Sequence, residues 1–361
     1  MKEEFNLSKS EKGSIIILVL ATMLLFLVVT FLAYTNLSIK EIEQKHKLEK
    51  IAEEYQSGKN ELDINMKMEE DYQYILSKQN FNYVVDDTNY CNSLAEALEV
   101  AQNGSIIKVL KNTQELIDNQ ALDINKNLTI DTNGNTINCS GNYCQLVVES
   151  EYELNIIGNG SMASNYSNCS FIVNNGTLVV DNVTISSPID VGQLGTISSD
   201  GTVNINGGKI IGTFYVRNGT ANINGGTFGT IQPSQFSNVS LITIENAEKI
   251  SYINLSNGGN LTIKGGNIEK IYLGSNHFDI NLTIGDINKA VNTNNPTIQS
   301  VEISPNGLVG IYTEINFLNG IVKEGFEDDL SDFIASEGGS FNVRTGYTIS
   351  TTSDGTILVA K

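Results

Sequence analysis

Alternation of apolar and polar residues dominates the middle of the chain. In short segments from residue 127 to residue 303, the second and fourth residues are apolar and the third is usually polar. This alternation predicts β-strands with one buried face and one wet face. The nine segments are Asn127–Ile130, Glu153–Ile156, Thr177–Val180, Thr202–Ile205, Thr220–Ile223, Leu241–Ile244, Asn260–Ile263, Asn281–Ile284 and Ser300–Ile303.

The nine segments recur at a nearly regular interval. Successive second positions lie 26, 24, 25, 18, 21, 19, 21 and 19 residues apart, which predicts one such strand per coil of a solenoid. A second strand shares the coils, with apolar residues at the first, fourth and sixth positions. Its members are Ile211, Phe214 and Val216; Phe228, Ile231 and Pro233; Ile250, Ile253 and Leu255; and Ile268, Ile271 and Leu273. Two strand series in step indicate a repeated coil.

Glycine and asparagine punctuate the coils at recurring positions. Gly176, Gly201, Gly219 and Gly259 precede the first strand, and Gly-Gly pairs follow it at residues 207–208, 225–226 and 265–266. Glycine supplies the backbone conformations that tight corners need, and equivalent asparagines can stack their amides in a ladder. Leucine-rich repeats share the period, but their Leu-x-x-Leu-x-Leu motif is absent. We therefore expect an all-β fold, a parallel β-helix.

A helix and a strand precede the first coil. Ser93, with Glu96 three residues on, opens a helical pattern that runs to Gln102, and the strand 106–110 follows. This opening resembles the amino-terminal cap of right-handed β-helix proteins of the pectate-lyase-like superfold. The resemblance covers about residues 90–305 and implies architecture without activity, because that superfold includes lyases, hydrolases, esterases and adhesins. We assign residues 86–305 to a capped β-helix. Residues 306–361 form a carboxy-terminal cap ending in a hairpin near Asp354-Gly355, or alternatively a separate small domain.

The amino terminus contains an apolar run from Ile15 to Ala33, in which only Thr22 and Thr30 are polar. Its length matches a hydrocarbon core about 30 Å thick, so we expect a transmembrane helix at residues 14–35. A cleaved secretory signal is the alternative, but the end of the run offers a poor cleavage context. Residues 36–85 show helical spacing among lysines and glutamates, which favours a stalk or linker. The amino terminus is expected inside the cell.

Lys12, Gly13 and Ser14 stand directly before the apolar run. This junction resembles the amino terminus of type IV prepilins and pilin-like proteins. The resemblance implies a cytoplasmic leader at residues 1–13, cleavage after Gly13 and a mature chain beginning at Ser14. The fifth mature position, usually glutamate in major pilins, is Leu18, and this departure weakens the prediction of filament assembly.

Charge and composition narrow the function. The net charge is −19, from 41 acidic and 22 basic residues, so a phosphate backbone would repel the chain and nucleic-acid binding is not expected. The two histidines, His46 and His277, lie far apart in sequence, which argues against a histidine triad or a zinc site. We predict neither a metal nor a cofactor.

Catalytic signatures are missing from the repeat. Paired carboxylates on neighbouring coils, expected of a polysaccharide hydrolase, do not appear, and adjacent aspartates occur only at 86–87 and 328–329. Asp332-Phe333-Ile334 matches a pectin-esterase motif in letters alone. Arg217 is the one arginine of the solenoid, and we interpret it as an exposed residue at the end of a strand. No catalytic residue is predicted.

Four cysteines, Cys91, Cys139, Cys144 and Cys169, fall near the first coils. Outside a membrane they are disulfide candidates, and three connectivities remain open.

The expected protein is a single-pass bacterial membrane protein with an extracellular β-helix. Its expected role is structural or adhesive contact with carbohydrate or a surface protein, while the lipid bilayer holds its anchor. The alternatives are a pilin-like filament subunit, with pilus-like assembly, and a polysaccharide lyase or hydrolase.

Overall fold

In the computed structural model the chain divides into two compact units, Met1–Phe81 and Asn82–Lys361. The structure describes residues 81–118, 120–141, 145–165, 169–188, 195–233, 240–274, 279–291, 295–304, 312–326, 334 and 339–361. The predicted leader and transmembrane helix, most of the stalk, and the junction at Gly13 and Ser14 lie outside these residues. Across the described ranges, no helix combines the length and apolar character needed to cross a membrane.

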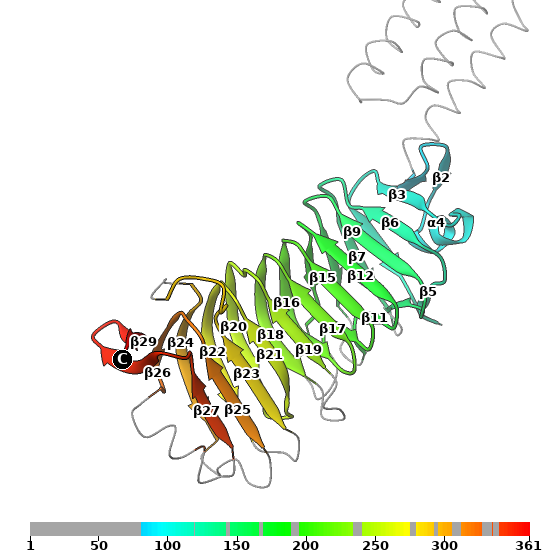
Figure 1. The fold of residues 1–361 in the computed structure, drawn as a ribbon. Coiled ribbons are helices and arrows are strands. Elements are labelled where there is room, and N and C mark those ends of the chain that lie inside the picture. The colour runs from blue at the N-terminus through cyan, green and yellow to red at the C-terminus, as the bar shows by residue number, and fades with distance from the viewer. Residues whose placement is uncertain are drawn as a thin grey trace, which may run out of the picture. The chain divides into compact units, whose positions relative to one another are not determined.

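The second unit is an all-β, solenoid-like domain built from two long sheets (Figure 1). The first sheet has 13 strands, and from β3 to β27 all its neighbours are parallel. In spatial order they are β2 (Asn89–Cys91), β1 (Tyr83–Val85), β3 (Ser105–Val109), β6 (Leu128–Asp131), β9 (Glu153–Ile157), β12 (Thr177–Asp181), β15 (Thr202–Ile205), β17 (Thr220–Ile223), β19 (Leu241–Ile244), β21 (Gly259–Ile263), β23 (Ile280–Ile284), β25 (Thr313–Phe317) and β27 (Ser340–Val343).

The second sheet has 16 strands and branches at β16 (Lys209–Val216). One branch runs through β13 (Thr184–Ser186), β10 (Ser161–Ser164), β7 (Thr136–Ser140) and β4 (Thr113–Leu116). The other runs through β14 (Ile197–Ser199), β11 (Ile172–Asn174), β8 (Leu146–Val148) and β5 (Leu122–Ile124). Beyond β16 a single series continues with β18 (Thr227–Pro233), β20 (Lys249–Asn254), β22 (Asn267–Leu273), β24 (Thr297–Ile303), β26 (Ile321–Glu324), β29 (Gly355–Ala360) and β28 (Tyr347–Thr352).

This branch explains the two coil lengths in the sequence. β16 pairs with β13 through residues 209–211 and with β14 through residues 214–216. Coils before β16 therefore carry three separate strands, whereas in later coils one long strand does the work of two. The repeated parallel strands agree with the solenoid that the sequence predicts.

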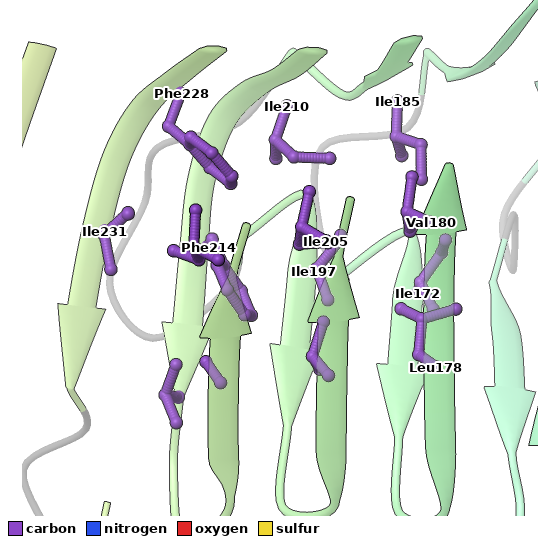
Figure 2. Packing of buried hydrophobic residues seen from close by; sticks show 14 of the residues in the cluster. Ile172, Leu178, Val180, Ile185, Ile197, Ile205, Ile210, Phe214, Phe228 and Ile231 are labelled. Atoms are coloured by element: carbon purple, nitrogen blue, oxygen red, sulfur yellow. The ribbon is translucent and has the colours of Figure 1, made fainter. Parts of the chain in front are cut away.

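The core is a set of apolar columns between the sheets. Leu178 and Val180 of β12 and Ile185 of β13 point into the same interior, and the columns repeat in neighbouring coils (Figure 2). All three side chains are fully buried. Because each inward residue stacks on its equivalent one coil away, burial supplies most of the driving force that holds the coils together.

Two details of the predicted registers are wrong. Ile210, not Ile211, occupies the core column, because β16 contains a bulge between Ile210 and Thr213; Ile210 is 1% exposed and Ile211 is 41% exposed. Ser300–Ile303 belongs to β24 of the second sheet, where Val301 pairs with Ile271. The ninth strand of the first sheet's series is β25, which pairs with β23.

The predicted helix is present as α4 (Leu94–Val100), at the amino-terminal end of the solenoid. Ser93 caps it by accepting a 3.1 Å hydrogen bond from the Glu96 N–H, and Glu96 accepts a 2.8 Å bond from the Asn92 N–H. At its other end, the Lys126 ammonium donates to the carbonyls of Leu98 and Ala101 at 3.1 and 2.9 Å. Each end of this short helix is therefore satisfied by a side chain.

The carboxy-terminal end closes with the predicted hairpin. β28 and β29 pair with antiparallel register from Tyr347↔Ala360 to Thr352↔Gly355. Beneath it, the ring of Phe326 makes edge contacts with Phe317 and Phe341, with centroids 5.6 and 5.4 Å apart. β25, β26 and β27 extend both sheets beyond residue 305.

Candidate contact face and hollow

The outward side of the first sheet carries two rows of hydroxyl and amide side chains, which we call the Thr/Asn face. Strand pairing holds the members of each row in register from β12 to β23. One row consists of Thr177, Thr202, Thr220, Leu241, Asn260 and Asn281, and the other of Val179, Asn204, Asn222, Thr243, Thr262 and Thr283. Neighbouring members are therefore separated by the strand spacing of about 4.8 Å.

Amides on this face hydrogen-bond to one another between coils, as the sequence predicts. Asn222 donates to Asn204 at 2.9 Å, and Asn281 donates to Asn260 at 2.8 Å. In the first pair, the ladder bond leaves a second N–H and a second lone pair for other partners. The threonines are β-branched and hold few rotamers, so their hydroxyls are also fixed in direction. The face presents a pre-organised array of donors and acceptors.

Ionisable groups lie at the borders of the Thr/Asn face and on the second sheet. Glu153 and Glu314 stand at its two ends, in register with the first row. On the outer side of the second sheet, Lys249 pairs with Glu269 at 2.7 Å and Lys270 pairs with Glu302. The hydrogen bond from Lys249 lowers the pKa of Glu269. The two outer surfaces therefore differ in chemistry: one is uncharged, and the other carries paired charges.

A hollow opens at the corner where the Thr/Asn face begins. Its volume is about 550 Å³, and it is lined by Asn127, Glu151, Tyr152, Glu153, Asn175, Gly176, Thr177, Gly201 and Thr202. The register explains its origin, because Tyr152 occupies the position that Gly176 and Gly201 occupy in the next two coils. A bulky residue followed by two glycines leaves space beside the ring.

Coil stacking accounts for these glycines. A Cβ added at Gly176 would lie 2.3 Å from the carbonyl oxygen of Tyr152, and one added at Gly201 would lie 2.0 Å from that of Gly176. No side chain is tolerated at this close approach. The hollow is thus bounded by backbone on one side and by the Tyr152 ring on the other.

The polar groups of the hollow are mostly unengaged. Within the described residues, the carboxylate of Glu151, the hydroxyl of Tyr152 and the side-chain amide of Asn175 have no hydrogen-bond or ion-pair partner. Glu153 accepts a 2.9 Å bond from Asn155. Asn127 uses its oxygen to accept from the Glu153 N–H at 2.9 Å. Their remaining donors and acceptors face an open space.

The predicted site residues are placed as follows. Cys91 and Cys139 are buried, Cys169 is partly exposed, and no disulfide joins these three. Cys144 lies outside the described residues, as do Asp328, Asp329, Asp332 and Phe333. Arg217 does stand just after a strand, where its guanidinium pairs with Asp200 at 2.6 Å. In the part of the chain that is described, no three His, Cys, Asp or Glu side chains gather as a metal site would require.

One polar cluster escaped the sequence analysis. Glu115 of β4 is 5% exposed and accepts hydrogen bonds from the Tyr83 hydroxyl at 2.8 Å and from the Leu94 N–H at 2.9 Å. The Tyr83 hydroxyl also lies 3.0 Å from that of Thr113. Burial, and next the charge of Glu115, raise the pKa of Tyr83. This network ties β1, α4 and β4 together, and every member is satisfied from within the cap.

Comparison with known proteins gives no match: no family model, curated protein or solved structure is similar to this chain.

Proposed function

We propose that this is a membrane-anchored bacterial cell-surface protein that displays a right-handed β-helix of the pectate-lyase-like superfold as a non-catalytic contact module. Its ligand is a carbohydrate polymer that lies on the Thr/Asn face. The observation that carries this proposal is an uncharged, in-register array of hydroxyls and amides on a chain of net charge −19.

The chemistry of the array suits a neutral polyhydroxyl ligand. Threonine hydroxyls and asparagine amides both donate and accept, as sugar hydroxyls do. A single exposed hydrogen bond contributes about 1 kcal/mol, so affinity must come from many contacts made at once. A repeating polymer on a repeating surface supplies these contacts, and the fixed side chains lose little entropy when it binds.

The test uses isosteric variants of the full-length protein in detergent micelles. Thr202→Val, Thr220→Val and Thr262→Val together remove three hydroxyls from the face but keep the β-branched shape. We expect retention on glycan arrays and insoluble polysaccharides to fall about tenfold or more, as the loss of about 1.4 kcal/mol would cause.

The matched control is Thr227→Val with Thr230→Val, which makes the same chemical change on the second sheet. This control should bind like the unmodified protein. The proposal fails if no carbohydrate is retained, or if both sets of variants reduce binding equally.

A further inference from the structure

We infer that the hollow beside Tyr152 holds an amine-bearing sugar unit of the polysaccharide on the Thr/Asn face. This inference rests on the proposed function and names the ligand chemistry of one position on that surface. The hollow adjoins the face directly, because Thr177 and Thr202 line the hollow and also begin the first row.

Size and shape fit a sugar ring. A volume of about 550 Å³ falls within the usual range of small-molecule sites, roughly 300–1,000 Å³. Tyr152 supplies an apolar ring with a hydroxyl at its edge, the combination that favours binding of amphipathic ligands. Glycine backbone opposite the ring lets a ligand approach the coil closely.

The open polar groups converge on the same space. Glu151, Tyr152 and Asn175 have no partner among the described residues, and Asn127 keeps its amide donors after accepting from Glu153. Hydroxyls of a sugar ring would satisfy these groups in place of water. The hollow thus offers both a ring surface and the hydrogen-bonding groups that orient a polyol.

Charge sets the preference for an amine. Two carboxylates line the hollow, and none of its lining residues is basic. The nearest lysine in the same column, Lys126, directs its ammonium to the carbonyls of Leu98 and Ala101. A protonated amine would therefore be attracted, whereas a uronic acid or a phosphate would be repelled.

The equivalent acid one coil beyond Asn175 shows a contrasting arrangement. Asp200, which aligns with Glu151 in the register, is already bound by Arg217 at 2.6 Å and by the Asn218 amide at 2.8 Å. The acid of the first coil has no such internal cation. Glu151 is the member of this column whose charge is left for a ligand.

The experiment measures binding of oligosaccharides to the full-length protein in micelles by isothermal titration calorimetry at pH 6. The probes are β-1,4-linked hexamers of glucosamine, of N-acetylglucosamine and of glucose. We expect the glucosamine hexamer to bind roughly fivefold to tenfold more tightly than the other two, the range that two partly exposed ion pairs supply. The preference should shrink as the salt concentration rises from 0.05 to 0.5 M, following the roughly threefold shorter Debye length.

Variants separate the hollow from the rest of the face. Glu151→Gln should bring the three hexamers within about twofold of one another, and Tyr152→Ala should weaken all three. Glu99→Gln, an exposed charge on α4, is the matched control and should preserve the preference.

The outcomes distinguish this inference from the proposed function. Equal binding of all three hexamers by the unmodified protein overturns the amine preference but leaves carbohydrate binding intact. A preference that persists in Glu151→Gln places the amine elsewhere and overturns the assignment of the hollow. Binding that disappears with a chelator shows that the carboxylates hold a divalent cation, which also overturns it. Absence of binding by all three hexamers overturns the inference, and retention on other polysaccharides would then decide the proposed function alone.

Discussion

Glu151 has a backbone conformation that L-residues rarely adopt. Its φ is 76°, in the left-handed region that favours glycine. For a residue with a side chain this conformation costs about 1–2 kcal/mol, and part of that relief is offset because glycine loses more chain entropy on folding. A strained residue in the lining of the hollow suggests that its carboxylate is retained for contact and not for stability.

Replacing this residue tests that interpretation. Glu151→Gly should raise the free energy of unfolding by roughly 0.5 kcal/mol while removing the carboxylate. Glu153→Gly, two residues on in the extended strand β9, should lower it by about 1 kcal/mol. Urea denaturation of both variants gives the comparison. If Glu151→Gly destabilises the protein as much as Glu153→Gly does, the left-handed backbone carries no cost.

Tyr83 makes stability depend on pH at the alkaline end. Its pKa is raised by burial and by the charge of Glu115, so the folded chain keeps the phenol proton at a pH where the unfolded chain, near pH 10, loses it. Stability from this group is therefore complete below about pH 10 and falls above it, by about 1.4 kcal/mol per pH unit.

The comparison with Tyr83→Phe isolates this effect. The variant should be about 1 kcal/mol less stable at pH 8, because it lacks the hydrogen bond to Glu115. Between pH 10 and pH 11 it should lose about 1.4 kcal/mol less than the unmodified protein. Tyr252, whose pKa is also raised by burial, is present in both proteins and cancels. Identical slopes in the two proteins would contradict the assignment.

At this scale the sequence held signals that could have located the two polar sites. Thr113 and Glu115 alternate in β4 as inward residues, and polar residues at inward positions indicate a buried network. Tyr152 stands in a column where the next coils carry glycine, and that exception marks the hollow. What the sequence alone could not give is the partner of each group, because Tyr83 and Glu115 meet across 32 residues.

Among the elements, β16 carries the feature that most affects register. Its bulge inserts an extra residue before the apolar pair of the second half, so the core column moves from Ile211 to Ile210. Ile210→Ala should cost about 3 kcal/mol of unfolding free energy, as for other buried isoleucines. Ile211→Ala, the exposed neighbour, should cost less than about 0.5 kcal/mol. Chemical denaturation separates the two, and the opposite ranking would restore the register expected from the sequence.

Spacing predicted the strands wherever the coil length stayed constant. Eight of the nine alternating segments lie in successive strands of the first sheet, from β6 to β23. The ninth failed because the coil after β23 is longer: Asn281 pairs with Glu314, 33 residues on. A short alternating segment such as Ser300–Ile303 fits either sheet, and only the distance to its neighbour decides between them.

For the molecule as a whole, stability depends on contacts between adjacent coils. Each coil pairs only with the coil before and the coil after it, so an interface lost in the middle divides the domain into two parts. Gly219 lies at such an interface, and a Cβ added there would lie 1.8 Å from the carbonyl oxygen of Gly201.

Gly219→Ala should therefore lower stability by about 3 kcal/mol or more and broaden unfolding into two transitions. Gly104→Asn is the control, because a side chain at Gly104 meets open space and asparagine tolerates its positive φ. Calorimetry distinguishes the outcomes. A single sharp transition in Gly219→Ala would show that the solenoid unfolds as one cooperative unit despite the lost interface.

The coil from residue 202 to residue 219 repeats in both sheets with one offset. Thr202 pairs with Thr220 in the first sheet and Lys209 with Thr227 in the second, 18 residues apart in each case. Tandem duplication of this segment in the gene would lengthen the solenoid by about 4.8 Å and change no other register. Each copy would add one threonine and one asparagine to the face. The chain can thus gain or lose ligand-binding reach in whole steps, a form of variation that a closed globular fold does not offer.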